Sequence, residues 1–255
     1  MIVKPMAGEP TVVMIPARLR STRLPDKPLA EIAGVPMIVQ VWRRACEAAV
    51  GPVVVACAEE AIVATVQAHG GTGVLTDPDL PSGTDRIFQA LGCIDPERRF
   101  TRVINLQGDL PTLEPAAIRA VLAPLDQLGT DMGTLAVATE DPLEKADPNV
   151  VKAIIALDPA RPRLGRALYF TRATAPSGDG PLYHHIGIYA FRREALERFA
   201  TLPPSPLERR ERLEQLRALE AGLSIGVALV DTNPLGVDTP DDLERARKEL
   251  AARVV

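Results

Sequence analysis

Apolar, β-branched runs alternate with amphipathic stretches through the first half of this 255-residue chain. The runs have the length of buried strands, and the stretches between them carry apolar residues at helical spacing. This alternation predicts an α/β fold with a Rossmann-like, mostly parallel sheet flanked by helices. Ligands of such sheets bind beyond the carboxyl ends of the strands, so residues that follow a strand are the first site candidates. The predicted strands are Val12–Ala17, Pro52–Ala58, Gly73–Thr76 and Arg102–Gln107, and the predicted helices are Pro36–Ala49, Glu59–His69 and two that begin near Thr84 and Glu114.

The rhythm changes after Thr130, where strand-like segments follow one another with no long helix between them. This pattern predicts an antiparallel, β-rich excursion at about 131–191, inserted in a single domain of residues 1–255. Helical character then returns before a last strand and a closing helix. The segments are Met132–Thr139, Val150–Leu157, Ala167–Phe170 and His185–Phe191 as strands, Leu207–Ala221 as a helix, Ile225–Val230 as a strand, and a helix after Pro240.

The composition argues against several classes of protein. The net charge of −4 and the aromatic content of only 4% argue against a nucleic-acid-binding protein. No apolar run approaches the roughly 20 residues of a membrane span, and the N-terminus lacks the apolar region of a signal peptide. We therefore expect a cytoplasmic enzyme without nucleic-acid or membrane partners. The cysteines lack zinc-ligand spacing and are predicted to be reduced core thiols: Cys46, Cys57 and Cys93.

A cationic loop directly follows the first predicted strand. Two prolines, Pro25 and Pro28, prevent this segment from becoming a helix. A strand that delivers a stiffened cationic loop is typical of α/β proteins that bind phosphorylated ligands, although a solvated surface loop has the same composition. The cations, four in ten residues, are Arg18, Arg20, Arg23 and Lys27.

Three further segments end where a ligand would lie. Ser82-Gly83-Thr84 precedes a helix and offers N–H groups to an anion or a base edge, or it is an ordinary helix cap. Asp109 follows a strand, where a carboxylate commonly holds Mg²⁺ or caps a turn. Asp238 precedes the last helix, and taken alone it is a helix-start signal. Together with the cationic loop, these carboxylates are the parts that metal-assisted nucleotidyl transfer requires. The chain lacks a P-loop motif and a dinucleotide-binding fingerprint.

The order of short motifs resembles that of the 3-deoxy-manno-octulosonate cytidylyltransferases, or CMP-Kdo synthetases. This family activates the eight-carbon acid sugar Kdo for lipopolysaccharide synthesis. The resemblance extends from Val12 to Arg247 and implies a fold of the nucleotide-diphospho-sugar transferase type. The motifs are I-P-A-R-x-x-S-T-R-L-P-x-K-P-L, G-V-P-M-I, S-G-T-D-R, Q-G-D-x-P, Y-F-T-R-A-T-A-P, H-I-G-I-Y, S-P-L-E, L-E-Q-L-R and G-V-D-T-P.

The resemblance implies a role for each matching residue, with CTP and Kdo as substrates and Mg²⁺ as cofactor. The implied reaction is CTP + Kdo → CMP-Kdo + pyrophosphate, by direct attack of the anomeric hydroxyl on the α-phosphorus, in a homodimer. The implied catalytic residues are Arg18, Lys27, Asp109 and Asp238, of which Asp109 and Asp238 ligate the metal. The implied CTP-binding residues are Pro16, Ala17, Arg18, Arg23, Lys27, Ser82, Gly83 and Gln107. The implied sugar-binding residues are Arg86, His185, Tyr189, Glu214 and Gln215.

Several of these roles have a structural alternative when the residues are read alone. Arg86 is also placed for an ion pair with Asp85 or Asp95. Adjacent His184 and His185 face opposite ways on a strand, so only one of them can point at a substrate, and both could be structural. Glu214 and Gln215 lie in an amphipathic stretch that reads as a solvated helix. Two other functions stay open: a relative that uses another acid sugar, and a protein that binds a nucleotide without turnover.

The chain departs from the family pattern at three positions and in the loop from Ala175 to Leu182, which is shorter than usual. Asp26 stands where members commonly have Gly, Leu110 where many have Glu, and Leu80-Pro81 where a His is often found. Asp tolerates unusual backbone angles better than most residues, so Asp26 is compatible with the turn that a Gly would make. For the homodimer, we expect the apolar strand Ile186–Phe191 and the excursion before it to supply the surface.

Overall fold

The structure is a computed structural model that describes residues 9–20 and 23–252. Ser21 and Thr22 of the cationic loop therefore lie outside the described residues. The chain divides into two compact units, Met1–Ile118 with Pro234–Val255, and Arg119–Asn233. The predicted excursion at about 131–191 lies within the second unit. Its description as an insertion in a single domain stays a prediction.

The first unit contains a parallel sheet in the order β5-β4-β1-β6. Strand β1 has four consecutive residues that are fully buried, as expected for a parallel strand covered on both faces: Val12, Val13, Met14 and Ile15. The predicted strands are thus found, and in the predicted parallel arrangement. Their bounds are β1 (Thr11–Ala17), β4 (Val53–Cys57), β5 (Thr72–Leu75) and β6 (Arg102–Asn105).

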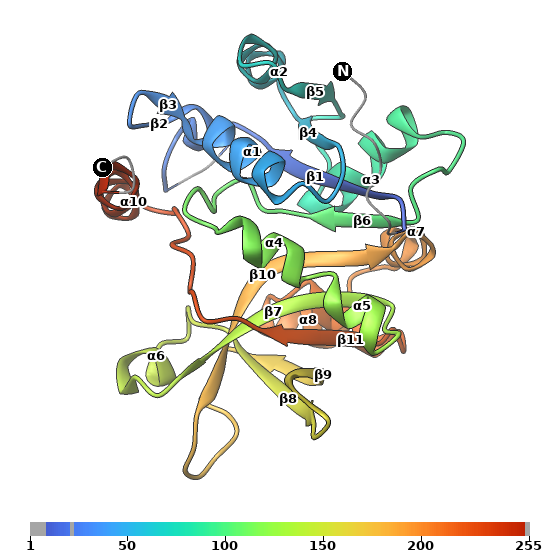
Figure 1. The fold of residues 1–255 in the computed structure, drawn as a ribbon, viewed down its shortest axis with the longest axis vertical. Helices are drawn as coiled ribbons and strands as arrows, with labels where there is room; N and C mark the ends of the chain where they lie inside the picture. The colour runs from blue at the N-terminus through green and yellow to red at the C-terminus, as the bar shows by residue number, and fades with distance from the viewer. Residues whose placement is uncertain (1–8, 21–22, 253–255) are drawn as a thin grey trace. The chain divides into compact units, whose positions relative to one another are not determined.

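Helices flank this parallel sheet (Figure 1). The chain crosses from β1 to β4 and from β4 to β5, and it then crosses to β6 on the other side of β1. The last helix packs Leu243, Ala246 and Leu250 against Ile32 and Val237. The elements are η1 (Lys27–Leu29), β2 (Glu31–Ile32), β3 (Val35–Pro36), α1 (Met37–Ala48), α2 (Glu60–Ala68), α3 (Gly83–Ile94), α4 (Pro115–Ala120, at the end of the unit) and α10 (Pro240–Ala252).

The second unit is built on strands in the order β10-β7-β11-β9-β8. Only β7 and β11 are parallel, and the other neighbours are antiparallel, so the predicted antiparallel character of this region is confirmed. The strands are β7 (Met132–Thr139), β8 (Lys152–Asp158), β9 (Arg161–Thr171), β10 (Leu182–Arg192) and β11 (Ile225–Leu229). The helices are α5 (Ala123–Gln127), α6 (Pro142–Ala146), α7 (Arg193–Thr201), α8 (Pro206–Glu211) and α9 (Gln215–Glu220).

The single helix predicted over Leu207–Ala221 is wrong. Arg212 adopts a left-handed conformation with φ 57°, which ends α8 and starts a turn before α9. The turn directs Leu213 and Leu216 into the core, with exposures of 6% and 0%. Helix α7 was not predicted, although Leu196 and Phe199 form its buried face.

Two other expectations about side chains are also wrong. Cys57 is buried, but Cys46 and Cys93 are exposed, because each lies on the outer side of its helix despite apolar neighbours in sequence. The apolar side chains of Ile186–Phe191 are buried, so this strand does not present an exposed apolar surface for a dimer.

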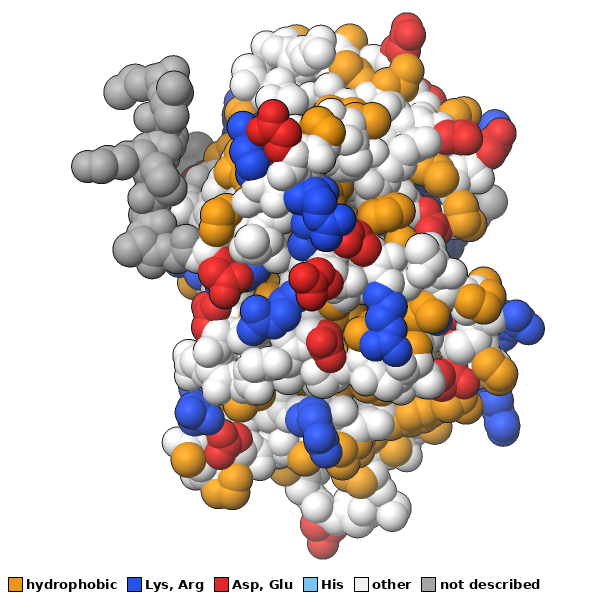
Figure 2. All heavy atoms as spheres, turned by 90° about the vertical axis from the view of Figure 1, so that its right-hand side faces the viewer, with side chains coloured by type: hydrophobic (Ala, Val, Ile, Leu, Met, Phe, Trp, Pro, Cys, Tyr) orange, Lys and Arg blue, Asp and Glu red, His pale blue; other side chains and the backbone are white. Residues whose placement is uncertain are grey.

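Charged side chains of both signs are interspersed on the face of the molecule in Figure 2.

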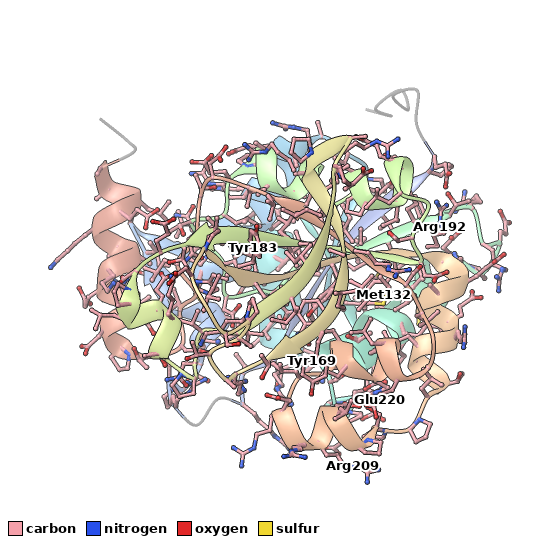
Figure 3. All side chains as sticks on the ribbon, turned by 90° about the horizontal axis from the view of Figure 1, so that it is seen from below. Met132, Tyr169, Tyr183, Arg192, Arg209 and Glu220 are labelled. Carbon is pink, nitrogen blue, oxygen red and sulfur yellow. The ribbon has the colours of Figure 1, made fainter. Side chains whose placement is uncertain are left out.

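In the second unit, Tyr169 of β9 lies on the side of α8 and α9, which carry Arg209 and Glu220 (Figure 3). Burial and Glu211 raise the pKa of Tyr169. Within residues 9–20 and 23–252, no helix combines the length and the apolar character that crossing a membrane would take.

Candidate functional site

A cavity of about 390 Å³ opens at the carboxyl ends of the parallel strands in the first unit. It brings together every residue predicted to bind CTP or metal, although these residues come from four separate segments of the chain. It also includes Arg20, Pro28 and Gly108, to which the family resemblance gave no binding role. The lining residues are Pro16, Ala17, Arg18, Arg20, Arg23, Lys27, Pro28, Ser82, Gly83, Arg86, Gln107, Gly108, Asp109 and Asp238.

Lys27 bridges the two predicted metal ligands. Its Nζ lies 2.7 Å from Oδ2 of Asp109 and 3.0 Å from Oδ1 of Asp238, and the Arg23 guanidinium lies 2.9 Å from the other oxygen of Asp238. Burial acts to lower the pKa of Lys27, but Asp109 and Asp238 outweigh it and the net pKa is raised. The four groups therefore form a charged cluster, in which Lys27 holds both carboxylates and Arg23 holds one of them.

Backbone geometry holds this cluster together. Val237 N–H donates to the carbonyl of Asp109 at 3.0 Å, which ties the two carboxylate segments to each other. Asp26 precedes Lys27 with φ 53° and ψ 26°, in the left-handed region that favours Gly. Asp tolerates that region better than most residues, so the conformation fits the expectation that Asp26 makes the turn a Gly would make. Leu110 is buried, with an exposure of 8%, so its side chain packs inward beside Asp109.

Helix α3 begins beside the cavity, where Ser82 and Gly83 are lining residues. The Ser82 hydroxyl accepts the Asp85 N–H at 3.1 Å and donates to the Asp85 carboxylate at 2.8 Å. The Ser82 side chain is thus committed to capping the helix, while Gly83, the first residue of α3, lines the cavity. Sequence reasoning offered capping and ligand binding as alternatives, and the geometry gives capping to the side chain.

A buried amide orients Gln107. Gln107 Nε2 donates to Asn105 Oδ1 at 3.2 Å, and Asn105 Nδ2 donates to the Thr84 hydroxyl at 3.3 Å. Asn105 itself is only 1% exposed. The contact occupies the amide nitrogen of Gln107 and turns its carbonyl oxygen toward Gly83. An acceptor in that place suits the amino group of a cytosine ring.

Arg86 makes neither of the two ion pairs that its sequence neighbours offered. Its guanidinium donates to the Thr76 hydroxyl at 2.6 Å and to the carbonyls of Asp77 and Pro78 at 2.9 and 3.4 Å. Burial, followed by the charge of Arg18, lowers the pKa of Arg86. Arg86 thus lines the cavity and also holds the Thr76–Pro78 segment.

The other predicted sugar residues lie in the second unit. His185 and Tyr189 occupy the same strand, with ring centroids 5.6 Å apart, and His185 Nε2 lies 2.9 Å from the Thr134 hydroxyl. Glu214 is close enough to Tyr189 to act, after burial, in raising the pKa of that phenol. Gln215 is 5% exposed. Sequence reasoning missed Thr134, because a single threonine within an apolar strand carries no signal of its own.

Comparisons with known proteins decide the family. The family described as Cytidylyltransferase matches residues 12–225. A 3-deoxy-manno-octulosonate cytidylyltransferase of Parvibaculum lavamentivorans is 64% identical over 99% of this chain and 96% of its own length. One from Paramagnetospirillum magneticum is 58% identical over 97% of this chain and 100% of its own length. This chain belongs to the 3-deoxy-manno-octulosonate cytidylyltransferases.

Solved structures agree with this assignment. A CMP:2-keto-3-deoxy-manno-octonic acid synthetase complexed with CTP has a TM-score of 0.88 and 37% identity, covering 96% of this chain and 100% of that chain. A 4-diphosphocytidyl-2C-methyl-D-erythritol synthase from Anaerococcus prevotii, with a TM-score of 0.63, 12% identity and coverage of 95% and 99%, shares the fold. The predicted fold class is confirmed, and the chain, as a 3-deoxy-manno-octulosonate cytidylyltransferase, is a nucleotidyltransferase.

Gly83→Ala is expected to raise the KM for CTP of this cytidylyltransferase about tenfold, or about 1.4 kcal/mol of binding. A Cβ on Gly83 would lie 3.0 Å from Cγ of Pro16, a rigid ring at the end of β1. Steady-state kinetics with varied CTP would measure the effect. Gly92→Ala is the matched control, since it lies in the same helix with nothing within 4 Å of the new Cβ. Equal KM values for CTP in the two variants would show that a Cβ on Gly83 does not impair the binding of CTP.

The stability of the cytidylyltransferase is expected to fall at acidic pH because of His185. Burial lowers the pKa of His185 to about 3, so the folded protein disfavours the charged ring, whereas the unfolded chain takes up a proton below about 6.5. His185 therefore contributes full stability above pH 6.5, and below it the free energy of unfolding falls by about 1.4 kcal/mol per pH unit. Urea unfolding at pH 7.5 and 5.5 measures this difference. A His185→Gln variant should lose that part of the pH dependence; an unchanged dependence would contradict the prediction.

Proposed function

We propose that this protein transfers the cytidylyl group of CTP to Kdo, releasing CMP-Kdo and pyrophosphate for lipopolysaccharide synthesis. The anomeric hydroxyl oxygen forms the new bond to the α-phosphorus, the bond from that phosphorus to the pyrophosphate oxygen breaks, and the hydroxyl proton is released. The observation that carries the proposal is the cavity of the first unit, where the cationic loop and both isolated carboxylates meet. The relatives' names supply the choice of CTP and Kdo.

Different residues of the cavity bind the phosphates and the cytidine of the nucleotide. Arg18, Arg23 and Lys27 bind the phosphates, and Lys27 offsets the negative charge that grows on the departing pyrophosphate. Pro16, Ala17 and the start of α3 border the cytidine, and the Gln107 carbonyl oxygen accepts from its amino group. Positioning and charge stabilisation suffice for this reaction, so no covalent intermediate with the enzyme is required.

The carboxylates suit a magnesium ion. The Lys27 ammonium stands as a cation between one oxygen of Asp109 and one of Asp238, which shows that both oxygens converge on a single cation position. Mg²⁺ prefers such hard oxygen ligands and usually takes one or two carboxylates together with substrate phosphates. Asp109 and Asp238 would hold it, and the ion would supply neutralisation of charge on the phosphate oxygens. Among the described residues, no group of three or more His, Cys, Asp or Glu side chains is arranged to hold a metal ion.

The sugar-binding assignments, the homodimer and the cytoplasmic location are parts of the same proposal. We assign Kdo binding to His185, Tyr189, Glu214 and Gln215 of the second unit. In the first unit, Arg86 is assigned to the sugar as well, and its guanidinium retains its three contacts to the Thr76–Pro78 segment. The dimer surface lies elsewhere than the buried strand first expected to form it.

Pyrophosphate release tests the function directly. The purified protein with Mg²⁺ would receive CTP, ATP, GTP or UTP, each with Kdo or with sialic acid. We expect release with CTP and Kdo only. Release with CTP and sialic acid would overturn the sugar assignment but keep the nucleotide site. Calorimetric binding of CTP without any release would overturn the proposed activity and leave a nucleotide-binding protein.

A further inference from the structure

Glu59 contacts the cationic loop from outside it. Glu59 is the residue before α2, and its Oε2 accepts the backbone N–H of Leu19 at 2.9 Å. Leu19 stands between Arg18 and Arg20, both of which line the cavity. Glu59 makes no side-chain cap to its own helix, so the carboxylate serves the loop and not α2.

The contact continues the pairing of two strands. The ladder between β1 and β4 ends with Ala17 opposite Cys57, and Ala58 N–H then donates to the Ala17 carbonyl at 3.0 Å. One residue after Ala58, the chain leaves the sheet at Glu59. There the Glu59 side chain, in place of a backbone carbonyl, accepts the N–H of Leu19. The backbone at Leu19 is thereby fixed relative to the sheet, and with it the starting points of the two arginine side chains.

The charge of Glu59 makes this contact informative. A carboxylate beside a phosphate-binding loop repels phosphate, so by Coulomb's law alone its removal would tighten the binding of CTP. A charged acceptor that holds a backbone amide has the opposite effect, since it orders the loop before the ligand arrives. The two effects differ in sign, which allows an experiment to separate them.

We propose that Glu59 is a positioning residue for CTP, which acts by holding the Leu19 amide so that Arg18 and Arg20 face the phosphates. The inference rests on the proposed function, because it takes the phosphates of CTP as the ligand of the loop. Glu59 is not one of the residues that line the cavity, so it acts on CTP through residues that do. Its charge also acts to raise the pKa of Arg86, and Glu59→Gln removes that effect while keeping the acceptor for the Leu19 amide.

Three variants of the full-length protein test the proposal by calorimetric titration with CTP. Glu59→Ala removes both the acceptor and the charge, and we expect it to raise the Kd for CTP about tenfold. Glu59→Gln removes the charge but keeps an acceptor for Leu19, so its Kd is expected to equal or fall below that of the wild type. Glu60→Ala is the matched control, the next residue in sequence, exposed and with the same change of charge; its Kd should stay within about twofold.

Hydrogen exchange adds a readout that does not depend on CTP. The peptide that contains Leu19 should exchange faster in Glu59→Ala than in the wild type or Glu59→Gln, while peptides from β6 keep their protection. If Glu59→Ala does not fold, the Glu59→Gln variant still decides, since a tenfold weaker Kd there would overturn the role assigned to the acceptor.

The outcomes separate the inference from the function on which it rests. A wild-type protein that fails to bind CTP would remove the proposed function itself. A wild type that binds CTP, with Glu59→Ala binding it equally well or more tightly, would overturn the positioning role and leave the function intact.

Discussion

Replacing Asp109 with alanine is expected to lower kcat for pyrophosphate release about 1000-fold, which corresponds to about 4 kcal/mol. In the wild type, one oxygen of Asp109 and one of Asp238 face the same cation position. The change leaves Asp238 as the one carboxylate of this pair. It also frees Lys27 from its 2.7 Å partner, so the ammonium moves toward Asp238 and competes for the one remaining ligand. Asp238→Ala should be as severe, since it additionally removes the partner of Arg23.

Kinetics and metal binding together check this prediction. Titration with Mn²⁺ in the presence of CTP, followed by electron paramagnetic resonance, should show weaker binding in Asp109→Ala. Asp241→Ala is the matched control, because it removes the same charge from an exposed position three residues after Asp238. Near-normal turnover in Asp109→Ala would show that the metal assignment at this residue is wrong.

The parallel half of the molecule was predictable from sequence for a physical reason. Strands covered on both faces are continuously apolar, and the helices between them are amphipathic, so both periods are visible in the chain. The predicted strand over Val12–Ala17 and helix over Pro36–Ala49 match β1 and α1 within a residue at each end. Because parallel strands end at one edge, the predicted CTP and metal residues meet in one cavity.

Features that depend on contacts distant in sequence were not predictable. The left-handed Arg212 that splits the predicted helix, and the register shift between Ile186 and Tyr189 in β10, arise from packing and leave no local pattern. Arg86 shows the same limit, since its partners include two backbone carbonyls in a preceding loop, which no pattern of residue types reveals. The contact of Glu59 with Leu19, 40 residues away, is invisible in sequence for the same reason.

The nucleotide site and the sugar residues differ in how far sequence reasoning reached. The cationic loop and the two aspartates combine charges that suit a phosphate and a metal, so chemistry alone suggested them. Tyr189 is a neutral, half-buried side chain, and desolvation raises its pKa well above the usual value. Only the family resemblance singled it out, because a tyrosine within an apolar strand otherwise reads as core.

Lys27→Met is expected to change metal binding and turnover in opposite directions. Without CTP, the Lys27 ammonium occupies the position between Asp109 and Asp238, and it must leave before a metal ion can bind there. Removing it should strengthen Mn²⁺ binding to the nucleotide-free protein about tenfold. The same change should lower kcat about 100-fold and raise the KM for CTP less, because negative charge on the departing pyrophosphate grows in the transition state.

Arg20→Met separates the position of Lys27 from its charge. It removes one positive charge from the same cavity, but the partner of Arg20 is the exposed Asp79 and neither metal ligand. Its Mn²⁺ affinity without CTP should therefore match that of the wild type. Equal Mn²⁺ affinities in Lys27→Met and the wild type would show that the lysine does not compete with the metal.

Competition between the Lys27 ammonium and the metal ion also predicts that CTP and Mn²⁺ strengthen the binding of each other. CTP offers Lys27 a new anionic partner, so its binding releases the two carboxylates, and the wild-type protein should bind Mn²⁺ more tightly with CTP than without it. Lys27→Met should lose most of that coupling, because its carboxylates are already free of the ammonium. If Lys27→Met lowers only the affinity for CTP and leaves kcat and the coupling between CTP and Mn²⁺ unchanged, Lys27 acts only in binding the substrate in its ground state.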